Sequence, residues 1–245
     1  MEQTTKLGAN KTGIDTSPED SKKMIEGANG SVGDLRGTDD GADLKSFSEF
    51  YLENAEPLGS VPMPATLKGM AKSTLKMMTG HHPQVFVNKL GERLAYERAG
   101  VRTYEQLIIK CRHAAEKGLT EIEVPIEKLE EFRNEEQEHF EMLKHCMEKL
   151  GCDPTAQTPD ADASAVASAG LMKVIVDPRT SVSQSLQAIL ALELTDNAAW
   201  DLLVKLAKDM GMSDMAKKFE HALAQEDDHL KHVRQWYEKS IRMQD

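Results

Sequence analysis

Glu136-Gln137-Glu138-His139 and Glu226-Asp227-Asp228-His229 are the two stretches of sequence that decide the fold of this chain. Each is a Glu-x-x-His motif within a long segment of helical apolar periodicity. Each also follows an earlier segment of that kind with one central glutamate, Glu97 or Glu193. Residues three apart share one face of a helix, so the glutamate and histidine of each motif point the same way. Four such segments predict a four-helix bundle, and the order Glu, Glu-x-x-His, Glu, Glu-x-x-His is the ligand pattern of a dinuclear metal site.

The four glutamates lie in the middle of apolar stripes and not on polar faces. Around Glu97, for example, apolar residues recur at helical spacing from Val87 to Cys111. Burying one unpaired carboxylate is unfavourable, and four together would also repel one another. Two divalent cations would offset those charges, and oxygen-rich coordination with two histidines suits Fe or Mn. The sequence therefore predicts two Fe ions, with Mn left open, bound by Glu97, Glu136, His139, Glu193, Glu226 and His229.

The periodicity, together with the residues that interrupt it, predicts four long helices. They span about 84–117, 125–150, 181–210 and 213–242, with a glycine after each of the first three and Ser213 as the cap of the fourth. Residues 151–180 connect the second helix to the third and include a short helix near 163–176. So long a crossover makes the second and third helices parallel. The predicted fold class is all-α.

Three regions are expected along the chain. Residues 1–60 are acidic and rich in Gly, Asp, Ser and Thr, so we predict a mostly disordered extension with a short helix around 43–54. Residues 61–82 form an amphipathic segment whose helix, at 64–79, has a basic face. That face could dock to an acidic partner or a membrane surface, although a helix strapped across the bundle is the simpler explanation. Residues 83–245 form the four-helix bundle.

Composition narrows the class of partners. The formal net charge of −11 argues against nucleic acid. The polar N-terminus does not resemble a signal peptide, and no apolar run is long enough for a transmembrane segment. Three cysteines without a Cys-x-x-Cys pair indicate reduced thiols, so we expect a cytoplasmic protein. A homodimer is left open.

The sequence also resembles a known superfamily. The stretch from Lys89 to Tyr104, KLGERLAYERAGVRTY, and residues 161–180 and 192–200 resemble bacterial ferritin-like domain proteins of unassigned function. The order of ligands resembles that of the ferritin-like superfamily, which includes ferritins, bacterioferritins and rubrerythrins. The resemblance covers roughly residues 61–245 and implies a ferritin-like four-helix bundle with metal ligands at the six positions above. The chain differs from rubrerythrins in lacking a rubredoxin-type Cys-x-x-Cys domain, and from cage-forming ferritins in showing no fifth helix after the fourth.

Three functions fit this pattern. We favour a dinuclear iron oxidoreductase that reacts with O₂ or peroxide, because the ligand set leaves room for exogenous ligands. Iron storage with ferroxidase chemistry is the second. The third is a non-enzymatic module in which the metal staples the fold while the basic helix or the acidic extension recruits a partner.

Several residues near the predicted ligands carry expectations of their own. Tyr104, two turns from Glu97 on the same face, could donate a hydrogen bond to the site or be oxidised there, or be a buried tyrosine with a satisfied hydroxyl. Asn197 is a candidate hydrogen-bond partner of the site, and Trp200 is expected in the core. The remaining nearby acids fall off the apolar stripes and are expected to be solvated: Glu92, Glu135, Glu138, Asp196, Asp227 and Asp228.

Overall fold

The computed structural model describes residues 22–23, 26, 42–62, 83–120 and 122–243. Every regular element among these residues is a helix, which confirms the predicted all-α class. The helices are α2 (Ala42–Asn54), α4 (Pro83–Glu116), α5 (Ile126–Leu150), α6 (Pro159–Val176), α7 (Val182–Asp209) and α8 (Ser213–Arg242).

Helix α2 forms where the short helix of the extension was predicted, and it belongs to a separate unit of the chain. The predicted basic helix at 64–79 lies outside the described residues, as do residues 1–21, 24–25 and 27–41 of the extension. The disorder of the extension, the amphipathic segment and the three-region division of the chain therefore stay predictions.

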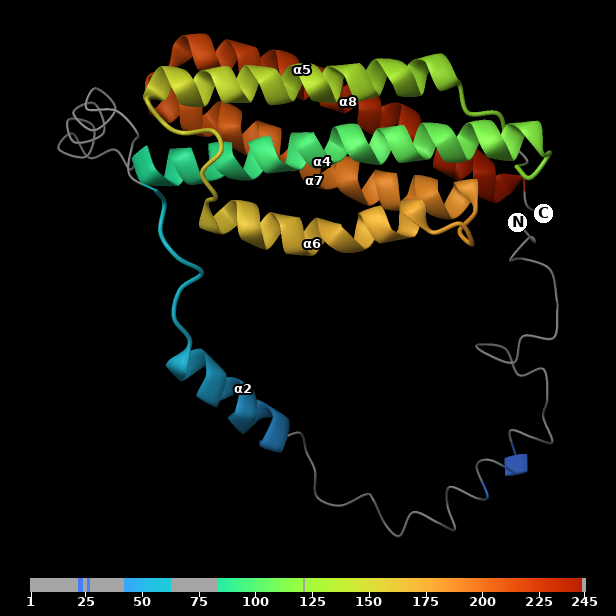
Figure 1. Cartoon of the computed structure of the whole chain (residues 1–245), viewed down its shortest axis with the longest axis horizontal. Helices are drawn as coiled ribbons and strands as arrows, with labels where there is room; N and C mark the ends of the chain where they lie inside the picture. The colour runs from blue at the N-terminus through green and yellow to red at the C-terminus, as the bar shows by residue number, and fades with distance from the viewer. Residues whose placement is uncertain (1–21, 24–25, 27–41, 63–82, 121, 244–245) are drawn as a thin grey trace. The chain divides into compact units, whose positions relative to one another are not determined.

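Helices α4, α5, α7 and α8 form the bundle (Figure 1). Helix α4 packs against α5 and α7, and α7 packs against α8. The crossover helix α6 runs along the outer side of α4 and α7 and contacts both (Figure 1). Because α6 carries the chain back along the bundle, α5 and α7 point in the same direction, as the long crossover predicted.

Local signals end the helices close to the predicted positions. Gly118, two residues after the end of α4, and Gly151, directly after α5, adopt positive φ angles of 60° and 82°, a conformation that glycine adopts without steric cost. Ser181 caps α7 through a reciprocal pair of hydrogen bonds with Gln184. The predicted Ser213 cap is wrong, because Ser213 is already helical and the preceding residue makes no side-chain cap. Helix α6 also begins earlier than predicted, at Pro159.

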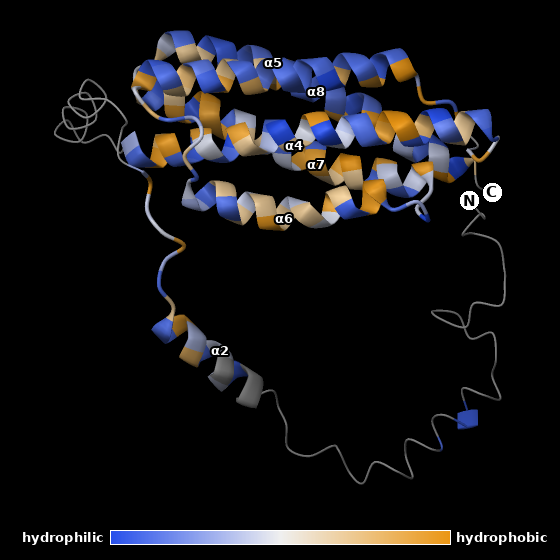
Figure 2. Cartoon of the chain, in the orientation of Figure 1, coloured by the Kyte–Doolittle hydropathy of each residue, from blue (hydrophilic) through white to orange (hydrophobic). Residues whose placement is uncertain are grey.

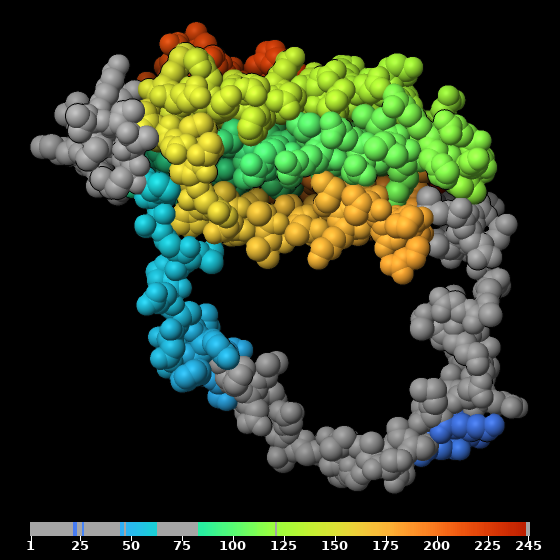
Figure 3. Space-filling view, viewed as in Figure 1, coloured from blue at the N-terminus to red at the C-terminus, as the bar shows by residue number. Residues whose placement is uncertain are grey.

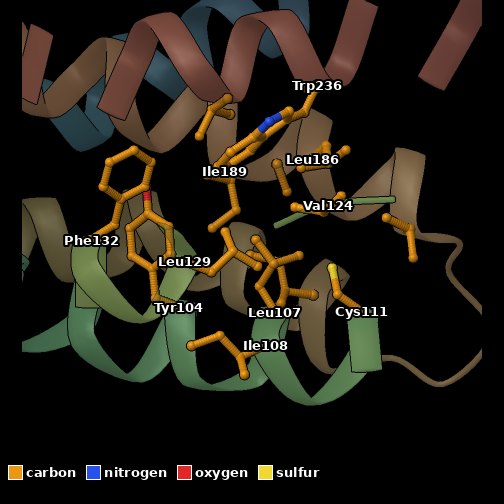
Figure 4. Close-up of a cluster of buried hydrophobic side chains, with 14 of the residues drawn as sticks. Tyr104, Leu107, Ile108, Cys111, Val124, Leu129, Phe132, Leu186, Ile189 and Trp236 are labelled. Atoms are coloured by element: carbon orange, nitrogen blue, oxygen red, sulfur yellow. The ribbon is translucent and has the colours of Figure 1, made fainter. Parts of the chain in front are cut away.

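The core of the bundle is divided in two along its length. One apolar cluster includes Tyr104, Phe132, Leu186 and Trp236 (Figure 4), and the other includes Trp200 and residues of all four bundle helices. Figure 2 shows hydrophilic residues over the outward faces of α5 and α8, and in Figure 3 side chains fill the spaces between α4, α5 and α6. Among the described helices, none combines the length and the apolar character needed to cross a membrane.

Candidate metal centre

The structure brings all six predicted ligands together in the layer between the two apolar clusters. Each bundle helix contributes one carboxylate, and α5 and α8 each add a histidine one turn later. All six side chains are buried, with relative exposures of 0–2%: Glu97, Glu136, His139, Glu193, Glu226 and His229.

The ligand atoms fall into three overlapping groups, each with all its atoms within 4.8 Å of one another. The groups are Glu136, Glu193, Glu226 and His229; Glu97, His139 and Glu226; and Glu97, Glu136, Asp196 and Glu226. Glu226 and Glu136 each share a group with Glu97 and another with Glu193, whereas Glu97 and Glu193 share none, so Glu226 and Glu136 lie between the two ends of the cluster. Each group could hold a metal ion.

Each histidine points its Nδ1 atom into the cluster. His139 Nδ1 lies 2.8 Å from Glu226 Oε1 and 3.4 Å from Glu97 Oε2. His229 Nδ1 lies 3.2 Å from Glu226 Oε2 and 3.7 Å from Glu193 Oε2. The two oxygens of Glu226 thus face different histidines, which is the placement expected of a bridging carboxylate.

The outer nitrogens of the histidines are held by the residues that precede the two Glu-x-x-His glutamates. Glu135 Oε2 lies 2.8 Å from His229 Nε2, and Gln225 Oε1 lies 3.1 Å from His139 Nε2. Gln225 also donates to Glu135 Oε1 at 2.7 Å, which fixes the orientation of its amide. Because both Nε2 atoms face acceptors, they carry the proton when the ring is neutral, and the Nδ1 lone pairs are left to bind a metal.

Buried polar atoms without hydrogen-bond partners test whether the cluster fits metal ions. Among the described residues, these atoms include both carboxylate oxygens of Glu97, Glu136 and Glu226, one oxygen of Glu193, and Nδ1 of both histidines. Buried polar groups are rarely left unpaired, because their desolvation is then uncompensated. The donors converge on one layer and comprise carboxylate oxygens and imidazole nitrogens. That donor set suits Fe or Mn, so the residues fit the predicted ions.

Protons balance part of the charge in the metal-free cluster. Burial opposes the charge of His139, but contacts with Glu226 and Glu97 outweigh it and raise its pKa to about 11. Burial is likewise outweighed at His229, where Glu135 and Glu226 raise the pKa to about 10. Burial raises the pKa of Glu193 to about 8 against the opposing effect of His229. A metal ion entering the cluster must therefore displace protons from these groups.

Tyr104 lies at the end of the cluster formed by Glu193. Its hydroxyl donates to Glu193 Oε1 at 2.5 Å, so the interpretation as a hydrogen-bond donor agrees with the geometry. Burial and then the neighbouring carboxylates raise the pKa of Tyr104, which keeps the hydroxyl protonated. Figure 4 shows its ring beside that of Phe132, which in turn lies 4.1 Å from the ring of His229. These rings form an apolar wall on this side of the cluster.

The structure contradicts the prediction that Asp196 is solvated. Asp196 is fully buried, and its Oδ1 lies 2.8 Å from Nη1 of Arg93, a buried arginine that was not among the predicted site residues. Arg93 Nε also lies 3.0 Å from Glu97 Oε1. The sequence held a signal for both residues, since Glu193-x-x-Asp196 repeats the spacing of Glu-x-x-His and Arg93 precedes Glu97 by one turn.

Two further expectations are corrected, and one residue was missed. Glu135, predicted to be solvated, is only 20% exposed and binds His229. Asn197 does not reach the site, because it donates to Asp227 on α8 instead. Gly100 was not singled out, yet a Cβ atom at this position would overlap the carboxylate of Glu136. A glycine inside a helix, three residues from a predicted ligand, was the available signal. Trp200 is buried in the core as predicted.

The fold and the site define a four-helix bundle protein with a buried carboxylate–histidine cluster that could bind metal ions. The family model of the ferritin-like domain matches residues 120–243, just over half of the chain. The chain therefore belongs to the ferritin-like family, as the resemblance predicted. Neither the curated proteins nor the solved structures include a match to this chain.

Proposed function

We propose that this protein is a dinuclear iron oxidoreductase, with Mn able to replace Fe, that reacts with O₂ or peroxide. The observation that supports it best is the convergence of four buried carboxylates and two inward-facing Nδ1 atoms in one layer. An Fe(II) pair bound there would supply the electrons for reducing the oxidant. A reducing cytoplasmic setting is part of this proposal, since the three cysteines are free.

The buried residues would hold the two ions in different ways. Glu226 and Glu136 would bridge the two ions, because they lie between the ends of the cluster. Glu97 with His139 would bind one ion, and Glu193 with His229 the other. Glu135 and Gln225 would hold the histidine rings in their binding orientation.

The surroundings of the cluster suit redox chemistry in a site shielded from bulk water. Phe132 and Trp200 place aromatic rings 4.1 and 5.4 Å from the rings of His229 and His139. Tyr104 holds a proton at its hydroxyl oxygen and donates it in a hydrogen bond to Glu193. It is therefore the group best placed to supply a proton, or to be oxidised itself, at the Glu193 end.

The test begins with the metal content of protein purified without a chelating tag. We expect about two Fe or Mn per chain, the number that the six-ligand pattern holds. Protein loaded anaerobically with Fe(II) should then be oxidised on mixing with O₂ or peroxide, as followed by absorbance. Glu226→Gln should lose both properties, whereas Glu220→Gln, an exposed glutamate of the same helix that pairs with Lys208, should retain them.

Each other result removes a defined part of the proposal. A loaded protein that reacts with neither oxidant would exclude the oxidoreductase and leave the metal as a structural staple. Oxidation of many Fe(II) ions per chain within a large hollow oligomer would identify iron storage instead. Protein that does not bind added Fe(II) or Mn(II) would show that the carboxylates serve another purpose.

A further inference from the structure

Arg93 is a buried cation in contact with a predicted metal ligand. Its side chain is about 2% exposed and comes from α4, one turn before Glu97. It forms ion pairs with Glu97 Oε1 at 3.0 Å and with Asp196 Oδ1 at 2.8 Å, and its guanidinium lies 4.3 Å above the ring of Tyr96. Burial opposes the charge, but Asp196 and then Glu97 outweigh it and raise the pKa of Arg93, so it stays charged.

The opposite end of the cluster has a neutral donor in the equivalent place. Glu193 Oε1 accepts a hydrogen bond from Tyr104, which also lies on α4. Each end glutamate therefore has one oxygen engaged by α4 and one oxygen directed toward a histidine: Glu97 Oε2 toward His139 and Glu193 Oε2 toward His229. The Glu97 end therefore has a buried guanidinium, itself paired with Asp196, where the Glu193 end has a neutral hydroxyl.

That charge acts on the two metal positions unequally. Arg93 contacts Glu97, which is a ligand only at the His139 end, and it contacts none of the ligands at the His229 end among the described residues. A fixed cation repels an incoming divalent ion and occupies one oxygen of that ion's ligand. In metal-free protein the same cation offsets Asp196 and, together with His139, Glu97.

We infer that Arg93 is a positioning residue and internal counter-cation that makes the ion beside Glu97 and His139 weaker-binding and more exchangeable than the ion beside Glu193 and His229. The inference rests on the proposed metal site and adds an order of binding to it. It also assigns Arg93 a second effect of opposite sign, which is to stabilise the bundle when no metal is bound.

Mn²⁺ alone is the probe, and free Mn²⁺ is counted by the electron paramagnetic resonance of the hydrated ion. The unaltered chain should bind two ions with dissociation constants that differ by about tenfold or more, as expected for one nearby charge in a partly screened site. In Arg93→Gln the weaker constant should tighten by about tenfold while the stronger one stays unchanged. Arg98→Gln, the same change at an exposed position of α4, should leave both constants unaltered.

Thermal unfolding provides a second readout and separates charge from packing. The Tm of metal-free Arg93→Gln should fall, and the rise in Tm on Mn²⁺ loading should exceed that of the unaltered chain. If Arg93→Gln does not fold without metal, Arg93→Lys takes its place in the test. Because this variant keeps the positive charge, it should still bind the second Mn²⁺ ion weakly. Two tight steps in Arg93→Lys would overturn the inference.

The failures of the two proposals are distinguishable. No Mn²⁺ binding by the unaltered chain would remove the metal site and this inference with it. Two ions bound by the unaltered chain with equal constants, or an unchanged isotherm in Arg93→Gln, would overturn the inference alone and leave the metal site standing.

Discussion

The two glutamates of the Glu-x-x-His motifs differ in what surrounds them in the metal-free cluster. Glu226 contacts both histidines, whereas Glu136 has two buried oxygens without a hydrogen-bond partner and only a distant contact with His229. Although burial alone would raise it, the histidines hold the pKa of Glu226 below its usual range. Burial and the neighbouring carboxylates, Glu226 and Glu97 first, raise the pKa of Glu136. The same chemical change should therefore have opposite effects at the two positions.

We predict that Glu136→Gln stabilises metal-free protein at pH 7 by about 1–2 kcal/mol, because it removes an unpaired buried carboxyl group from a repelling cluster. Glu226→Gln should destabilise it by a similar or larger amount, because two histidines lose their counter-charge. Urea unfolding of the two metal-free variants measures both free energies. Both variants should also lose at least one bound ion. If both substitutions stabilise the metal-free protein, or both destabilise it, the different surroundings assigned to Glu136 and Glu226 are contradicted.

Tyr104→Phe tests the hydroxyl that holds Glu193. We expect a loss of about 1–2 kcal/mol in metal-free protein, because the buried Glu193 Oε1 is left without a donor. Tyr96→Phe is the matched control, since its hydroxyl donates to the backbone oxygen of Leu192 and not to a ligand. Only Tyr104→Phe should alter Mn²⁺ binding at the Glu193 end. Equal isotherms for the two variants would limit Tyr104 to a packing role.

At the scale of single helices, Gly100 is a position within α4 where the Glu136 carboxylate leaves no space for a side chain. Alanine favours a helix interior over glycine by about 1 kcal/mol, so Gly100→Ala would stabilise α4 if propensity decided. Because a Cβ atom there would overlap the Glu136 carboxylate, we predict net destabilisation and weaker metal binding instead. Gly170→Ala on α6 is the control, because a Cβ atom there has no neighbour within 4 Å among the described residues. It should raise the melting temperature, and a matching rise in Gly100→Ala would contradict the proposed close approach.

Helix α6 illustrates how an element can be predicted while its surroundings cannot. Its presence near residues 163–176 was predicted from the sequence of the crossover. Its start at Pro159, after the Thr158 cap, became clear only in the structure. Its packing along α4 and α7 is a tertiary result, since the crossover needed only to span the bundle. Helix periodicity gives the buried face of an element but not the neighbour that covers it.

Over the whole molecule, the charge of the cluster links stability to pH. His139, His229 and Glu193 have raised pKa values, about 11, 10 and 8, in the metal-free fold. Between about pH 5 and 10 the folded state therefore holds protons that the unfolded state has released, and stability falls as pH rises. The stabilisation from the histidines is full below their ordinary pKa of about 6.5 and is lost as pH passes their raised values. The lowered pKa of Glu226 acts only at the acidic end, outside this window.

We predict that the Tm of metal-free protein falls steadily from pH 6 to pH 9, because the free energy of unfolding falls by about 1.4 kcal/mol per pH unit for each extra proton held. Metal loading should reverse the trend, because bound ions replace those protons and bind more tightly as pH rises. Calorimetry of both forms at three pH values measures the slopes. A flat or rising Tm in the metal-free form would contradict the proton balance of the cluster.

The sequence by itself determined the helices, the order of the ligands and their burial in one layer. These follow from periodicity, because a residue at i+3 or i+4 of an apolar stripe shares its face whatever the neighbouring helix is. The family match at residues 120–243 agrees with the predicted fold class. The six predicted ligand positions were accordingly chosen from the residues of each helix alone.

Only the tertiary structure decided what meets across the helices. The pairing of Arg93 with Asp196, the contacts of Glu135 and Gln225 with the histidines, and the space that Gly100 leaves for Glu136 each join different helices. They depend on how each helix is rotated and staggered against the next, to within a fraction of a helical turn. A side chain at the edge of a stripe, such as Asp196, is solvated or buried according to that rotation, which the pattern within one helix does not contain.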